Sequence, residues 1–136
     1  MCYEIIRMMN DQKQFSRPTE KELEILRIVW EKGPVSVKDV HELLGGDPSN
    51  GFTTILKLMQ IMNEKGLVKR DDSIKTHIYQ PAVTKEKTQK HMLGKMINTL
   101  FGGSTTELVI QALGNHKATA DELEEIQKLL TEMKNQ

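Results

Sequence analysis

Apolar residues recur at helical spacing from residue 18 onward, and local signals predict where each helix begins and ends. Thr19-x-x-Glu22 is a capping-box pattern that opens an apolar run, which Gly33-Pro34 ends. Ser36-x-x-Asp39 opens a second, shorter helix, which Gly45-Gly46 ends. Four residues of this second helix are expected to point inward: Val37, Val40, Leu43 and Leu44.

A third helix is predicted from about Phe52 to Lys65, with Gly66 as the residue that ends it. On a helical wheel of 100° per residue, one side of this helix is apolar and the other is polar. The apolar side consists of Ile55, Leu58, Met59 and Met62. The polar side consists of Thr53, Lys57, Gln60 and Glu64. We therefore expect one side in a core and the other in solvent or against a ligand.

Two strand-like runs follow, Leu67–Arg70 and Thr76–Tyr79. A polar turn over residues 71–75 joins them, and Pro81 is expected to end the second strand. Three helices followed by such a hairpin within residues 18–82 are typical of a winged helix-turn-helix domain. The predicted fold class is therefore mainly α with a small β-hairpin wing, followed by a helical region over residues 83–136.

This C-terminal region is predicted to form three more amphipathic helices, Thr84–Leu100, Ser104–Leu113 and Thr119–Lys134. The winged domain is too small to cover all three apolar faces, so we expect an isologous dimer in which a second copy covers them. The alternative is that the helices pack back on the winged domain of their own chain. The residues assigned to the dimer interface are Met96, Leu100, Leu108, Val109, Ala112, Leu113, Leu123, Ile126, Leu129 and Leu130.

The 136-residue chain has a formal net charge of zero, but its charge is unevenly distributed. Residues 51–90 contain 8 Lys and Arg against 4 acidic residues, a net charge of +4. Residues 101–136 contain 3 Lys against 6 acidic residues, a net charge of −3. A basic segment flanked by acidic ones suggests a surface that faces an anion, and an ordinary solvated surface is the alternative interpretation of charge alone.

Composition argues against several classes of protein. A single cysteine, Cys2, rules out a disulfide framework and a zinc site with paired thiolates. No uncharged apolar run reaches the roughly 18 residues of a membrane span, and the apolar stretch of a secretory signal is missing. We therefore expect a cytoplasmic protein. Residues 1–17 are expected to form a flexible tail. The four histidines lack metal-ligand spacing, and no phosphate-loop or nucleophile pattern occurs. We therefore predict no enzyme activity, metal or cofactor.

The polar side of the third helix suits the major groove of double-stranded DNA. Thr and Lys side chains reach phosphates or base edges, and Gln can pair with adenine, which makes Thr53, Lys57 and Gln60 predicted contacts. Any surface helix carries such residues on its wet side, so the interpretation depends on the preceding short helix and the following basic hairpin. As a wing, the hairpin is predicted to contact the DNA backbone or an adjacent minor groove through Lys69, Arg70, Lys75 and His77.

In order and spacing, these segments resemble the penicillinase-repressor family of bacterial winged-helix transcriptional regulators. The resemblance covers roughly residues 18–133 and is carried by residues 19–26, Val29-Trp30, 33–40, 53–56, 64–70, 79–81, 100–103 and Leu108-Val109. It implies a repressor that binds a palindromic operator as a homodimer, with the third helix in the major groove and the C-terminal helices in the dimer. The contact positions of the family fall on Thr53, Thr54 and Lys57, and the wing contact falls near Lys75.

In some family members, a membrane-bound sensor protease ends repression by causing cleavage within the dimerisation region. The resemblance implies such a partner upstream of this chain, but the Asn-Phe cleavage pair aligns with Gln111-Ala112, so the residues do not support proteolytic release. The C-terminal cysteine pairs of the copper-responsive branch are absent, which argues against metal sensing. The alternative to a repressor is a winged-helix protein-interaction module without specific DNA binding.

Overall fold

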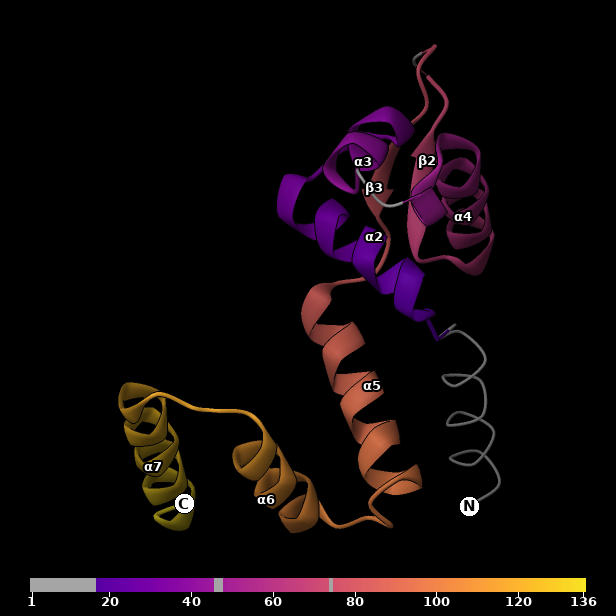
Figure 1. Cartoon of the computed structure of the whole chain (residues 1–136). Coiled ribbons are helices and arrows are strands. Elements are labelled where there is room, and N and C mark those ends of the chain that lie inside the picture. The colour runs from indigo at the N-terminus through magenta and orange to yellow at the C-terminus, as the bar shows by residue number, and fades with distance from the viewer. Residues whose placement is uncertain (1–16, 46–47, 74) are drawn as a thin grey trace, which may run out of the picture. The chain divides into compact units, whose positions relative to one another are not determined.

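The computed structural model describes residues 17–45, 48–73 and 75–136 (Figure 1). Apart from residue 17, the predicted N-terminal tail lies outside the described residues. The described part contains six α-helices and a three-stranded antiparallel sheet, which confirms the predicted fold class. The helices are α2 Glu20–Lys32, α3 Val37–Leu43, α4 Phe52–Lys65, α5 Lys85–Thr99, α6 Thr105–Asn115 and α7 Ala120–Lys134. A short 3₁₀ turn, Pro48–Asn50, precedes α4.

Both N-terminal capping boxes form as predicted. In α2, the Thr19 hydroxyl accepts the Glu22 amide at 3.2 Å, and the Glu22 carboxylate accepts the Thr19 amide at 3.2 Å. Ser36 and Asp39 make the same reciprocal pair at the start of α3, at 3.1 and 3.0 Å. Each box satisfies two amides that the first helical turn leaves without a backbone partner. The helix starts are therefore encoded locally.

The sheet has the order β1-β3-β2, with β1 Val35–Ser36, β2 Val68–Asp71 and β3 Ile78–Pro81. β1 was not predicted, because a two-residue strand is too short to show a period. Pro81 is the last residue of β3 and so ends the second strand as expected, but the strand covers Ile78–Pro81 rather than Thr76–Tyr79. The Ala82 amide donates to Leu67 O at 3.0 Å, so the nitrogen of Pro81 points away from β2, toward the side where β1 has not yet begun and no donor is needed.

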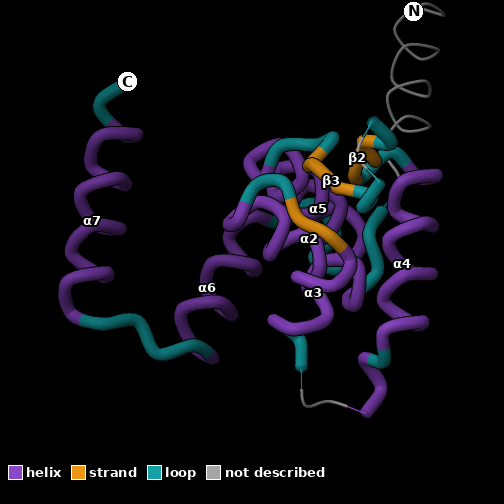
Figure 2. Tube along the Cα trace, turned by 90° about the horizontal axis from the view of Figure 1, so that it is seen from above, coloured by secondary structure: helices purple, strands orange, loops and turns teal. Residues whose placement is uncertain are grey.

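The core of the winged domain lies between α2, α3, α4 and the sheet. The predicted apolar side of α4 is confirmed, since Ile55, Met59 and Met62 are fully buried and Leu58 packs partly against them. One prediction for α3 is wrong, because Leu43 is 53% exposed. Leu44, four positions after Val40, packs against the core as predicted. Seen from above, α4 runs along one side of this unit (Figure 2).

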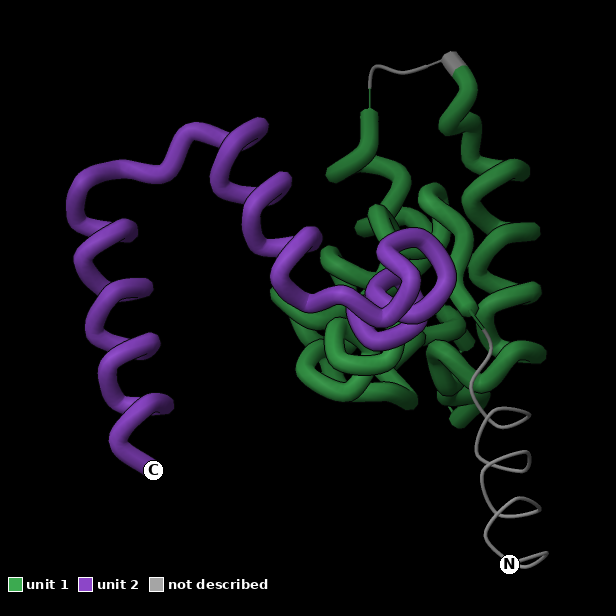
Figure 3. Tube along the Cα trace, turned by 90° about the horizontal axis from the view of Figure 1, so that it is seen from below, with its two compact units in different colours: residues 1–92 green, residues 93–136 purple. Residues whose placement is uncertain are grey.

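The chain divides into two compact units, Met1–Met92 and Leu93–Gln136, and the division falls inside α5 (Figure 3). The first unit contains the whole of the predicted winged domain, residues 18–82. Within it, the Trp30 indole N–H donates to Val83 O at 2.9 Å, which ties the end of the sheet to α2 just before α5 begins. The predicted boundary between residues 82 and 83 lies between β3 and α5.

Candidate nucleic-acid interface

Four of the predicted DNA contacts lie on α4, and all four side chains are exposed: Thr53, Thr54, Lys57 and Gln60. They lie on the first three turns of the helix. The opposite side of the same helix supplies three fully buried core residues. Because that buried side fixes the rotation of α4 about its axis, the polar side is presented to solvent as a rigid surface.

An ion pair holds the C-terminal end of α4 against the start of α2. Lys65 Nζ lies 2.6 Å from Oε1 of Glu22 and 3.1 Å from its Oε2, and the Glu22 side chain is only 2% exposed. Burial alone would raise the pKa of Glu22, but the hydrogen bonds from Lys65 and Thr19 outweigh it and lower that pKa. Sequence reasoning assigned Glu22 to the capping box and missed its partner, which is 43 residues away.

The start of α4 contacts α3 through aromatic rings. The Phe52 and His41 ring centroids are 5.8 Å apart, with an edge-on interplanar angle of 78°. Phe52 is nevertheless 47% exposed and precedes Thr53 on the first turn, so it adds an apolar group beside the predicted hydroxyl contacts. Phe52 was not among the contacts predicted from the sequence. The feature that could have indicated it is an aromatic residue outside the apolar side of the helix.

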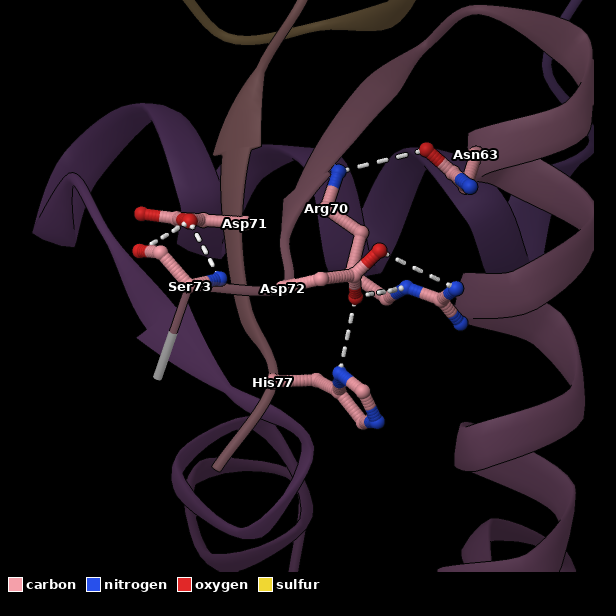
Figure 4. A network of polar contacts seen from close by, with 6 residues as sticks. All are labelled: Asn63, Arg70, Asp71, Asp72, Ser73 and His77. Atoms are coloured by element: carbon pink, nitrogen blue, oxygen red, sulfur yellow. Dashed lines mark hydrogen bonds and ion pairs between the residues drawn. The ribbon is translucent and has the colours of Figure 1, made fainter. Parts of the chain in front are cut away.

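The wing is the hairpin formed by β2, β3 and the turn between them. Lys69 and Lys75 are exposed, as a contact with the DNA backbone requires. Arg70 is partly buried, and its backbone amide donates to Oδ1 of Asn63 at 3.2 Å, which fastens the wing to α4 (Figure 4). Asn63 was not predicted to act in the site. It couples the two elements that carry all the predicted contacts.

The side chain of Arg70 has a partner within the wing itself. Its Nε lies 2.6 Å from Asp72 Oδ1, and its Nη2 lies 3.4 Å from Asp72 Oδ2. His77 Nδ1 lies 2.9 Å from the same Oδ1 (Figure 4). The hydrogen bond and charge of Asp72 raise the pKa of Arg70. Of the three predicted wing cations, the structure therefore shows Arg70 in an ion pair with an acidic neighbour.

A second carboxylate of the wing makes only local contacts. Asp71 Oδ1 accepts the Ser73 hydroxyl at 2.6 Å and the Ser73 amide at 3.0 Å. These two bonds lower the pKa of Asp71. Asp71 thus shapes the turn and interacts with the charge of Lys69, whereas Asp72 contacts Arg70 directly.

The predicted dimer residues lie on the second unit and are largely exposed. Leu100 is 71% exposed, and α6 and α7 contain no buried residue. Only two of the ten assigned residues, Leu108 and Ile126, are partly buried. The other eight are exposed: Met96, Leu100, Val109, Ala112, Leu113, Leu123, Leu129 and Leu130.

In the described part of the chain, no three His, Cys, Asp or Glu residues lie close enough together to hold a metal ion. None of the described helices has the length and apolar character needed to cross a membrane.

The helix-turn-helix formed by α3 and α4, with the β2–β3 hairpin beside it, defines a winged-helix protein. The family model described as penicillinase repressor matches residues 18–132, so the chain belongs to the penicillinase repressor family, as the resemblance implied. A penicillinase repressor of Bacillus licheniformis is 20% identical over 123 residues, covering 90% of this chain and 96% of the relative. A penicillinase repressor of Staphylococcus aureus is 23% identical over 126 residues, covering 93% and 98%.

Membership in this family supports a general role in repressing transcription. Both relatives are named as repressors, which are regulatory proteins rather than enzymes.

Proposed function

We propose that this chain is a homodimeric transcriptional repressor that binds a palindromic DNA operator and blocks transcription by occupying it. The observation that carries the proposal is the arrangement of α4. One side of this helix is locked into the core, and the other presents four exposed polar side chains, within a family of repressors. A helix held in this way can enter the major groove without losing further conformational freedom.

The exposed residues of α4 divide the work of recognition by their chemistry. Thr53 and Thr54, on the first turn, offer hydroxyls to phosphates or base edges. Lys57 offers a cation to a phosphate or to the acceptors of guanine, and Gln60 offers an amide that matches adenine. The wing residues Lys69, Arg70 and Lys75 are proposed backbone contacts, which position the protein without reading sequence.

The dimer is proposed from the exposed apolar residues of α5, α6 and α7. A second copy presents the same residues, so a twofold axis can cover both sets at once. Two α4 helices related by that axis would enter successive major grooves roughly 34 Å apart. The operator is accordingly expected to be twofold symmetric.

An upstream sensor protease stays a prediction from the resemblance. Gln111 and Ala112, at the position of the family's cleavage pair, lie within α6 with exposed side chains. A protease would have to unwind α6 to cut between them. Release by dissociation of the intact repressor is therefore the mechanism we propose.

Selection of bound sequences from random duplex DNA tests the function directly. The expected result is enrichment of one twofold-symmetric site, together with sedimentation of the free protein as a dimer. Binding without any sequence preference would contradict the proposal and favour the alternative, a winged-helix module that binds another protein.

The role of α4 is tested by Lys57→Ala, compared with Lys117→Ala in the loop between α6 and α7. Both variants remove one exposed positive charge. We expect Lys57→Ala to weaken binding to the selected site by about 1–3 kcal/mol, and Lys117→Ala to have a much smaller effect. Equal affinities for the two variants, measured by fluorescence anisotropy across a range of salt concentrations, would remove Lys57 from the interface.

A further inference from the structure

Asp72 connects the two arms of the wing. Arg70, on β2, and His77, immediately before β3, both contact its Oδ1, at 2.6 and 2.9 Å (Figure 4). Asp72 Oδ2 adds a 3.4 Å hydrogen bond from the Arg70 guanidinium. One carboxylate therefore satisfies an arginine and a histidine on a hairpin that is expected to face DNA.

We propose that Asp72 acts as an internal competitor of DNA phosphate for Arg70, and that it thereby limits the affinity of the protein for the DNA backbone. The proposal rests on the proposed function, because it assumes that the wing lies against the DNA backbone. It assigns to Asp72 a role in setting DNA affinity that involves no contact with a base.

The chemistry of the pair allows this exchange. A guanidinium binds a carboxylate and a phosphate in the same way, through parallel N–H donors. The Arg70, Asp72 and His77 side chains are 33%, 58% and 52% exposed, whereas Arg70 Nε itself is buried, so a phosphate would approach the other nitrogens of the guanidinium. Because the Arg70 amide is held by Asn63, the guanidinium can change partners without moving the strand.

The exchange has a free-energy cost on any DNA. Binding to non-operator DNA depends almost entirely on contacts between cations and phosphates. On the operator, the contacts of α4 with bases add to the same phosphate contacts. Occupying Arg70 therefore costs the same free energy on both kinds of DNA, and the effect is measured most directly on non-operator DNA, where phosphate contacts supply almost all of the affinity.

Asp71 supplies a matched control one residue away. It carries the same charge on the same hairpin, but in the described part of the chain its carboxylate accepts hydrogen bonds from Ser73 and interacts with the charge of Lys69. Asp71→Asn and Asp72→Asn each remove one negative charge, and asparagine retains the ability to cap a local turn. A difference between the two variants therefore reports the contacts of Asp72 with Arg70 and His77, and the Arg70→Gln background separates the two.

The experiment measures the binding of full-length protein to a mixed-sequence duplex of roughly 30 base pairs, about three helical turns, and to the selected operator. Fluorescence anisotropy is recorded from about 50 to 200 mM salt for wild type, Asp71→Asn, Asp72→Asn, Arg70→Gln and the Arg70→Gln/Asp72→Asn double variant. Circular dichroism checks that each variant is folded.

We expect Asp72→Asn to bind the mixed-sequence duplex roughly two- to fivefold more tightly than Asp71→Asn, the range expected for an exposed ion pair. The slope of log affinity against log salt should steepen by about 1, since Arg70 gains a phosphate contact. The ratio of operator to non-operator affinity should stay the same, because Arg70 gains the same phosphate contact on both duplexes. The gain should disappear in the Arg70→Gln background.

Two results overturn the inference while leaving the proposed function intact. One is equal affinity and equal salt slope for Asp72→Asn and Asp71→Asn, which would show a general effect of charge. The other is a gain that persists without the Arg70 guanidinium. If wild-type protein bound neither duplex, the proposed function itself would fail, and the inference with it.

Discussion

The pair formed by Lys65 and Glu22 makes a prediction about stability that the sequence alone could not make. Lys65→Met removes the ammonium but keeps most of the apolar stem of the side chain. It leaves the Glu22 carboxylate, whose side chain is 2% exposed, with the Thr19 amide as its remaining backbone donor. Since that carboxylate lies where α2 meets the end of α4, the variant tests what holds α4 in place.

Removing one partner of a fully buried ion pair costs about 3–5 kcal/mol. The Lys65 side chain is 30% exposed, so water can partly replace the lost ammonium. We therefore expect Lys65→Met to lower the free energy of unfolding by about 2 kcal/mol at pH 7. Adding Glu22→Gln should recover part of this loss, because no charge is then buried without a partner.

The loss of unfolding free energy in Lys65→Met should decrease as pH falls. In wild type the pKa of Glu22 is lowered from 4.5, so its stabilising contribution is complete above pH 4.5 and disappears as pH falls through the lowered value. In Lys65→Met the main lowering interaction is gone, and burial should raise the pKa of Glu22. The difference in stability between the two proteins should therefore be largest at neutral pH and shrink toward pH 4.

Urea unfolding followed by the fluorescence of Trp30, the only tryptophan, reports on the winged domain. Lys57→Met makes the same replacement at an exposed position of α4 and should stay within about 0.5 kcal/mol of wild type. Two results would refute the role assigned to the Lys65–Glu22 pair. One is a loss of unfolding free energy for Lys65→Met as small as that for Lys57→Met. The other is a loss that does not change between pH 7 and pH 4.

Three further variants test the core, a helix cap and the dimer. Met59→Ala should cost about 2–5 kcal/mol in urea unfolding because the side chain is fully buried, and a loss below about 1 kcal/mol would contradict that burial. Thr19→Ala should cost about 1 kcal/mol in the same assay because the first turn of α2 loses its cap. Leu129→Glu should yield a monomer in sedimentation, whereas its neighbour Lys128→Glu should remain dimeric; two dimeric variants would argue against Leu129 in the interface.

Much of the winged domain could be predicted because its signals are local. Several of these features depend on residues within about two helical turns of one another. They are the Thr19 and Ser36 caps, the αL glycine at position 66 with φ of 81°, and the apolar side of α4. Propensity and periodicity act over this range. The exposed residues of α4 follow from the same period, since fixing the buried side fixes the opposite one.

The contacts missed by the sequence reading join residues that no local rule relates. Lys65 meets Glu22 across 43 residues, and the Trp30 indole meets Val83 across 53, through the fold itself. The pair of Arg70 and Asp72 was missed for a different reason. The two residues are near neighbours in the sequence, but a count of charges treats them as separate. A count of charges treats Arg70 as available to DNA. Geometry shows that an acceptor already occupies it, and the exchange of partners proposed above follows from that pair rather than from net charge.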